Sequence, residues 1–147
     1  MSQASTNQTT ATANITTFRR AIDEGWSRGS LDAIDELLAP DFVEHQAGIG
    51  PGREAVKNSI RSLRTAFPDL HLTFEAATAD GDLVWARISA TGTHEGPFMG
   101  VSATGRPIRV DVIDIVRVVD GKLVEHWGVA DRLSLAQQLG IVPAGPS

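Results

Sequence analysis

Residues 106–131 decide the fold, and they read RPIRVDVIDIVRVVDGKLVEHWGVAD. The segment from Ile108 to Val119 is rich in β-branched residues, which favour strands. Asp120-Gly121 is a two-residue turn signal, and residues 122–127 return as a partner strand, so we expect a long β-hairpin. Two aspartates, a glutamate, a histidine and a tryptophan interrupt its apolar pattern. Because charged residues inside an apolar strand are costly unless their face is wet or paired, one face of this hairpin is expected to line a site.

Length and composition indicate one globular domain. The chain has 147 residues, of which 41% are hydrophobic and 21% charged. It has no cysteine, which excludes disulfides, thiolate nucleophiles and Cys-based metal sites. A net charge of −5 without a basic stripe argues against a nucleic-acid partner. Since there is neither an apolar run of membrane-spanning length nor a secretory signal pattern, we expect a cytoplasmic protein that binds no membrane.

The part of the chain before the hairpin begins with helices. Residues 1–13 are almost all Ser, Thr, Gln, Asn and Ala, which cannot offset the entropy of ordering, so they are predicted to form a disordered tail. A first helix is expected from Asn14, where apolar residues take helical spacing. Ser30 should cap a second helix that ends before Pro40, and residues 53–67 form a third, amphipathic helix.

Strand patterns follow the third helix. Residues 70–75 alternate between apolar and polar, and residues 83–94 form a second strand after an Asp-Gly-Asp turn. A short extended piece at residues 41–45 precedes the third helix, and a last short helix is expected at residues 132–139. The loop at residues 95–107 has an unusual apolar content for a connection, which is typical of a pocket lid.

Helices followed by long antiparallel strands predict an α+β fold. A strongly twisted sheet curls, and with helices on its concave side it forms a cone. We therefore expect a cone-shaped, curled antiparallel sheet wrapped around the N-terminal helices and enclosing a hydrophobic pocket. The domain is expected to span residues 14–142, with tails at 1–13 and 143–147. No phosphate-cradling glycine loop, nucleophile elbow or metal-ligand spacing of the histidines is present, and we expect no metal.

Asp114 is the leading candidate for acid/base chemistry. It is flanked by two isoleucines, so an inward-pointing carboxylate would be desolvated and its pKa should rise. The alternative is a structural ion pair with Arg87 or Arg109. Asp111 has the opposite strand parity and cannot face the same cavity without a bulge.

Other candidates lie across the hairpin and around the expected cavity rim. Pairing through the turn brings Asp114 opposite a residue between Glu125 and Trp127, so His126 could be a base that Asp114 orients. A neutral histidine bonded to a backbone carbonyl is the alternative. His45 and His94 are each either rim residues that bind a substrate oxygen or ordinary surface residues. Trp127 suits a wall or an interface.

Four segments resemble the SnoaL-like polyketide cyclase and ester cyclase family, which belongs to the nuclear transport factor 2-like cone folds. They are DFVEH at 41–45, TGTHEGPFMG at 91–100, TGR at 104–106, and DGKLVEHW at 120–127, with LSLAQQLG following at 133–140. The resemblance implies a homodimer through the outer face of the sheet and chemistry without metal or organic cofactor. It also implies intramolecular aldol closure of a polyketide ring, with an aspartate as acid/base. The family's catalytic aspartate falls here at Gly128, and a pocket histidine of the family falls at Asp114.

The leading hypothesis is a cofactor-independent cyclase that acts on a hydrophobic polyketide-like ester. Asp114 would be the acid/base, and His126 and His45 would assist it or bind oxygen. The residues expected to bind substrate are Trp85, His94, Phe98, Met99, Trp127 and Asp131; Asp131 could instead cap the last helix.

Two alternative functions remain open from the sequence. An epoxide hydrolase on the same fold would use paired aspartates and an arginine to activate water, and the residue types are supplied by Arg109, Asp111, Asp114 and Asp131. A non-catalytic, dimeric small-molecule-binding module is the other alternative, and Gly128 favours it.

Overall fold

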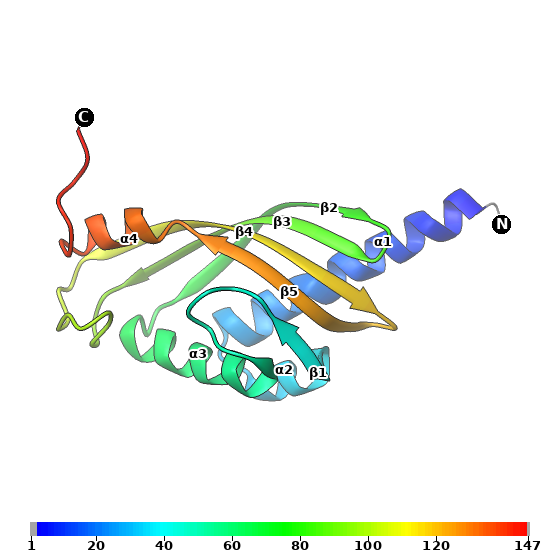
Figure 1. Cartoon of the computed structure of the whole chain (residues 1–147), viewed down its shortest axis with the longest axis horizontal. Coiled ribbons are helices and arrows are strands. Elements are labelled where there is room, and N and C mark those ends of the chain that lie inside the picture. Colours follow the sequence, from blue (N-terminus) through cyan, green and yellow to red (C-terminus); the bar gives the residue numbers. More distant parts are fainter. Residues whose placement is uncertain (1–2, 147) are drawn as a thin grey trace.

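The computed structural model describes residues 3–146, which form N-terminal helices and a curled five-stranded sheet (Figure 1). The elements in chain order are α1 (Gln3–Arg20), the π-helical segment η1 (Ala21–Ser27), α2 (Leu31–Leu37), β1 (Leu38–Glu44), α3 (Gly52–Ala66), β2 (His71–Asp80), β3 (Leu83–Thr93), β4 (Pro107–Val119), β5 (Lys122–Ala130) and α4 (Arg132–Gln138). The predicted α+β class is confirmed.

The strand order in the sheet is β1-β5-β4-β3-β2. Strands β2 to β5 pair antiparallel, as expected for a meander. The short extended piece predicted at residues 41–45 falls mostly in β1, which joins the antiparallel strands at one edge by pairing parallel with β5 and brings Glu44 beside His126. The chain can make this parallel pair since α3 and three strands separate β1 from β5 in the sequence.

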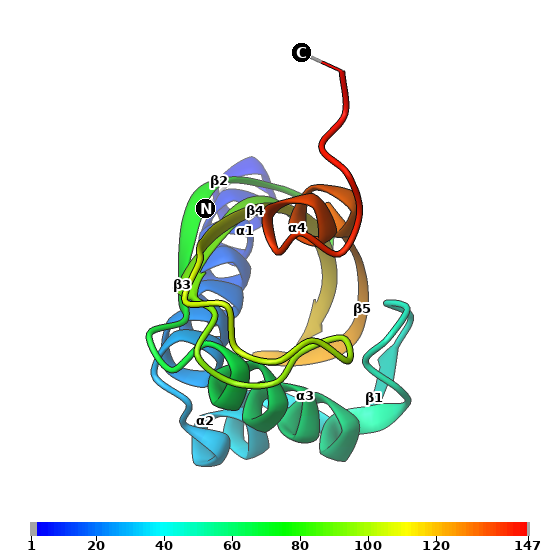
Figure 2. The ribbon, with the colours of Figure 1, turned by 90° about the vertical axis from the view of Figure 1, so that its left-hand side faces the viewer.

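The sheet curls into an open arc whose two edges are β1 and β2 (Figure 2). Seen along the cone, α1, α2 and α3 cover the open side of the arc that β2 to β5 form. The main hydrophobic core lies between these layers and joins helix residues to inward-facing strand residues; its members include Phe18, Ile22, Ile34, Leu37, Ile60, Val84, Ile88 and Val116. A second cluster packs the end of α3 against β4 and α4; it includes Phe67, Leu70, Ile108, Val110 and Leu139.

The predicted hairpin is confirmed, but its register differs by one residue. Asp120 and Gly121 both adopt positive φ angles, of 50° and 74°, as the tight turn requires. Val118 pairs with Leu123 whereas Arg117 pairs with Glu125, so one extra residue of β5 bulges out. This bulge places Asp114 opposite Gly128 instead of a residue between 125 and 127, and it puts the side chains of Asp114 and His126 on the same face.

The N-terminal segment corrects a prediction, because residues 3–13 are helical and continue α1 rather than forming a disordered tail. Their side chains are almost all exposed. The hydroxyls of Thr9 and Thr12 donate to backbone carbonyls four residues earlier, at 2.9 and 3.0 Å. Since extending a helix costs far less than nucleating one, the segment can propagate from the turns anchored by Phe18. Residues 1 and 2, also part of the predicted tail, lie outside the described residues.

The helix boundaries follow local chemistry. Ser30 caps α2 as predicted, and its hydroxyl accepts the Ala33 N–H at 3.2 Å. The first predicted helix ends as η1, whose Gly25 lies so close to Ile34 that any Cβ there would overlap it. No helix within residues 3–146 has both the length and the apolar character to cross a membrane.

Candidate functional site

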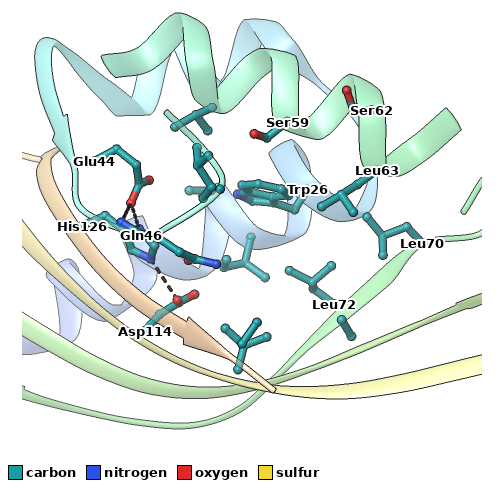
Figure 3. A pocket seen from close by; sticks show the side chains of 18 of the residues that line it. Trp26, Glu44, Gln46, Ser59, Ser62, Leu63, Leu70, Leu72, Asp114 and His126 are labelled. Atoms are coloured by element: carbon teal, nitrogen blue, oxygen red, sulfur yellow. Dashed lines mark hydrogen bonds and ion pairs between the residues drawn. The ribbon is translucent and has the colours of Figure 1, made fainter. Parts of the chain in front are cut away.

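A cavity of about 490 Å³ lies between the concave face of the sheet and the helices. Its volume falls in the usual range for small-molecule sites. Apolar side chains make most of its wall, among them Phe18, Trp26, Leu63, Phe67, Leu70, Leu72, Phe98, Ile108, Val110, Val112 and Leu135. The polar residues of the wall are few: Glu44, Gln46, Asn58, Ser59, Ser62, Asp114, His126 and Arg132. The predicted hydrophobic pocket is thus present, with a small polar cluster at one side (Figure 3).

The polar cluster is a histidine held between two buried carboxylates. His126 Nε2 lies 2.9 Å from Asp114 Oδ1, and His126 Nδ1 lies 2.6 Å from Glu44 Oε1. The exposed fractions of the three side chains are 11% for His126, 8% for Asp114 and 2% for Glu44. Figure 3 shows the three groups in one line along the edge of the cavity. They are brought together from β4, β5 and the end of β1.

Charge balance keeps the His126 ring protonated. Burial alone would lower its pKa, but hydrogen bonds and charge attraction from Asp114 and Glu44 outweigh that effect and raise the pKa from 6.5 to about 9. An imidazolium donates from both ring nitrogens, so each N–H has a carboxylate acceptor. Asp114 and His126 lie side by side, as predicted. Neither arginine considered as an alternative partner is bonded to Asp114, since Arg87 is exposed and Arg109 lies 3.7 Å from Glu75.

Gly128 is the residue that gives the Asp114 carboxylate its space. It is the direct strand partner of Asp114. A Cβ built on Gly128 would lie 2.5 Å from Asp114 Oδ1 and 2.8 Å from His126 Cε1, and it would overlap the Gln46 side-chain oxygen. Real Cβ atoms essentially never approach other heavy atoms so closely. A larger residue at this position would therefore displace the cluster.

His45, a predicted catalytic residue, lies on the outer face of the sheet. Its Nε2 is 2.7 Å from Glu125 Oε2, and its ring stacks on Trp127 with 5.0 Å between centroids. The hydrogen bond from His45 lowers the pKa of Glu125, although burial opposes it, and Arg117 adds to the effect. Successive strand residues point to opposite faces, so Glu44 faces inward and His45 outward.

Three residues predicted to form the substrate wall also lie outside the cavity. Trp85 and Met99 are each 46% exposed. Trp127 packs between His45 and Arg117 on the outer face. For Trp85 and Trp127 the reason is strand parity, since their neighbours Val84 and His126 face inward. Met99 lies in a turn, with a φ of 51°, and is not part of the cavity wall.

Phe98 is the lid residue that reaches the cavity, as predicted. It lines the wall and packs edge-on against Phe67, with 5.3 Å between ring centroids. His94 lies behind this pair and is fully buried, so it contacts Phe67 and not the cavity, contrary to the prediction. Its Nδ1 accepts the Thr104 backbone N–H at 3.2 Å, which ties together the two ends of the lid loop. His94 is therefore a structural residue of the lid.

The remaining predicted residues have structural positions. Asp131 caps α4, because its carboxylate accepts the Ser134 N–H at 3.0 Å, and it does not line the cavity. Arg109 and Asp111 are exposed. The residues proposed for an epoxide hydrolase therefore do not meet: Asp114 alone of that set faces the cavity. Within residues 3–146, no group of three or more histidines and carboxylates is arranged to hold a metal ion.

The sequence-based prediction did not include Glu44 or Gln46. Glu44 lies two residues after the buried Phe42 and so on the same face of the strand, and that parity was the signal for an inward carboxylate. Gln46 carried no signal, because it lies in a loop whose path depends on β1 pairing with β5. Trp26, at the end of the first predicted helix, was not predicted as a site residue, and it lines the cavity from η1 (Figure 3).

Comparisons with known proteins point to one family. The family model described as SnoaL-like polyketide cyclase matches residues 16–139. DauD from Streptomyces sp. (strain C5), an aklanonic acid methyl ester cyclase, is 32% identical over 127 residues, which cover 82% of this chain and 78% of DauD. AclR from Streptomyces galilaeus, a provisionally assigned hydroxylase, has a TM-score of 0.84 and 31% identity, and the match covers 93% of this chain and 87% of the AclR chain. IdmH from Streptomyces antibioticus, a provisionally assigned polyketide cyclase, has a TM-score of 0.78 and 36% identity, with coverage of 86% and 98%.

Proposed function

Since this chain belongs to the SnoaL-like polyketide cyclase family, we propose that it closes a carbon ring in a hydrophobic polyketide ester by an intramolecular aldol reaction. The observation that carries the proposal is the Asp114 carboxylate, buried in an apolar cavity and bonded to His126 at 2.9 Å. The relatives that are aklanonic acid methyl ester cyclases support a polyketide methyl ester as the substrate class.

The proposed reaction needs one proton shuttle. The Asp114 carboxylate removes a proton from the carbon between two carbonyl groups of the substrate, and an enolate forms. The enolate carbon attacks a ketone of the same molecule, the new C–C bond forms, and the C=O electron pair moves to oxygen. Asp114 returns its proton to that alkoxide, so the product is a cyclic isomer of the substrate. No oxidant, metal or organic cofactor is called for in this sequence.

His126 and Glu44 are positioning residues in this scheme. Both N–H groups of the imidazolium are bonded to carboxylates, so the ring holds Asp114 in one orientation. The cluster carries two negative charges and one positive charge in the resting state. When Asp114 accepts a proton, the cluster becomes neutral as the substrate becomes negative, which limits repulsion between them. The apolar wall excludes water, and this strengthens each of these interactions.

The test is the conservative Asp114→Asn variant, assayed by ring closure of a linear polyketide methyl ester. The loss of a general base should lower kcat by about 10²–10⁴-fold while the fold is retained. Asp111→Asn is the matched control, because Asp111 lies on the same strand but is exposed. Undiminished turnover in Asp114→Asn would contradict the proposal.

We also infer a homodimer through the outer face of the sheet. Trp85, Ile113 and Val129 are 46%, 48% and 73% exposed and come from the adjacent strands β3, β4 and β5. Apolar side chains gathered on neighbouring strands support burial against a second copy. The cytoplasmic location expected from the sequence stays a prediction.

A further inference from the structure

The residue beside the cluster, Gln46, is fixed by the cluster itself. Its backbone N–H donates to Glu44 Oε1 at 2.9 Å, and the same oxygen accepts the His126 Nδ1–H at 2.6 Å. One carboxylate oxygen therefore holds both His126 and the start of the loop between β1 and α3. The position of Gln46 is coupled to that of the acid/base groups.

The Gln46 carboxamide occupies the space that Gly128 leaves free. Its side-chain oxygen lies against Gly128, where any Cβ would overlap it. Figure 3 shows the side chain next to His126 and Asp114, with its nitrogen directed into the cavity. A primary amide has two N–H donors. Neither finds an acceptor among residues 3–146, although the side chain lines the cavity and is half-buried.

The proposed reaction creates a need for such a donor. The enolate that Asp114 generates carries its negative charge on an oxygen close to the carbon that lost the proton. His126 cannot serve that oxygen, because both of its N–H groups are bonded to carboxylates. Of the remaining polar side chains of the wall, Ser59 and Ser62 on α3 lie across the cavity from Asp114 (Figure 3). The Arg132 guanidinium lies against Gly48, in the loop that follows β1.

We propose that Gln46 is a catalytic residue whose side-chain N–H binds the enolate oxygen of the substrate while Asp114 takes the proton. This inference rests on the proposed cyclase function and deepens it: the substrate must present a carbonyl oxygen, ester or ketone, next to its acidic carbon. Gly128 is needed for this arrangement, because its lack of a side chain leaves room for the Gln46 carboxamide beside the enolate oxygen. A donor placed in advance at a developing oxyanion contributes about 10²–10³-fold to kcat.

The experiment separates enolate formation from ring closure. The probe is an aryl β-keto methyl ester that has no further ketone for its enolate to attack, so it can form the enolate but cannot close a ring. The measurement is the exchange of its acidic hydrogen with deuterated solvent, followed by NMR. Gln46→Ala should slow exchange on the enzyme by about 10²-fold, with KM little changed. Gln46→Glu, which puts a carboxylate beside Asp114, should slow it at least as much. Gln137→Ala, a matched change outside the cavity lining, should exchange like the wild type.

A second measurement distinguishes a donor from a structural role. The His126 ring should still titrate near pH 9 in Gln46→Ala, because its two carboxylate partners remain. A shifted His126 pKa in this variant would show that the slower exchange comes from a disturbed cluster, and it would overturn the donor role. Exchange that falls in Asp114→Asn but stays within about threefold of wild type in Gln46→Ala would also overturn it, and would leave the cyclase proposal intact. Wild-type protein that catalyses no exchange would contradict the cyclase proposal itself.

Discussion

Asp114 on β4 and Gly128 on β5 face each other across the hairpin, and the Asp114 carboxylate reaches within 2.5 Å of the place where a Cβ of residue 128 would be. The family resemblance puts the catalytic aspartate at position 128. In this chain the carboxylate comes from the neighbouring strand but lies in nearly the same space. The acid group can therefore be retained while the residue that carries it changes.

Adding one methyl group at Gly128 should disturb this arrangement. In Gly128→Ala the new Cβ would overlap Gln46 and press on Asp114, so we expect turnover to fall by tenfold or more and stability to fall by about 1–3 kcal/mol. Ring-closure assays and urea denaturation measure the two effects. Gly145→Ala, where a Cβ would lie 3.6 Å from the Gln137 side-chain nitrogen and meet no close contact, is the control. Full activity in Gly128→Ala would show that the space is not needed.

The raised pKa of His126 predicts how stability depends on pH. Because the folded protein holds this proton more tightly than the unfolded chain, the stabilisation is complete below pH 6.5 and is lost as pH rises through about 9. The loss should be about 3 kcal/mol between these limits. Urea denaturation at several pH values measures it, and the His126 ring signals should titrate near pH 9 by NMR. His71→Gln, which alters an exposed histidine on β2, is the matched control.

The lid residue Phe98 should contribute to substrate binding. In Phe98→Ala the wall loses a ring that packs against Phe67, so we expect KM to rise by about 10- to 100-fold with a smaller change in kcat. Met99→Ala is the matched control, since Met99 is the exposed neighbour in the same loop. Equal effects of the two substitutions would argue against an inward role for Phe98.

The oligomeric state should depend on the exposed apolar residues of β3, β4 and β5, which are Trp85, Ile113 and Val129. A stable interface of standard size buries about 800 Å² on each partner. Val129→Glu, at the most exposed of these residues, should convert a dimer to a monomer in sedimentation equilibrium, because it would bury an unpaired charge. Met99→Glu is the control, because it adds the same charge outside the sheet and should leave the dimer intact. A wild-type protein that sediments as a monomer would contradict the inferred dimer.

The sequence by itself determined most of the elements of this protein. Strand periodicity and the Asp-Gly turn predicted the hairpin, Ser30 predicted the start of α2, and the isoleucines around Asp114 marked a carboxylate in an apolar setting. These are local features, because propensity, capping and side-chain alternation depend on residues that are near in the chain. The pairing of Asp114 with His126 was also within reach, since a short hairpin leaves few possible registers.

Only the tertiary structure decided how the site is completed. The bulge in β5 sets which residue faces Asp114, and the parallel pairing of β1 with β5 brings Glu44 and Gln46 to the same cluster from about 80 residues away. The same pairing turns His45 outward and strand parity removes Trp85 and Trp127 from the cavity. Contacts between distant segments depend on how the whole sheet curls, and no local pattern in the sequence carries that information.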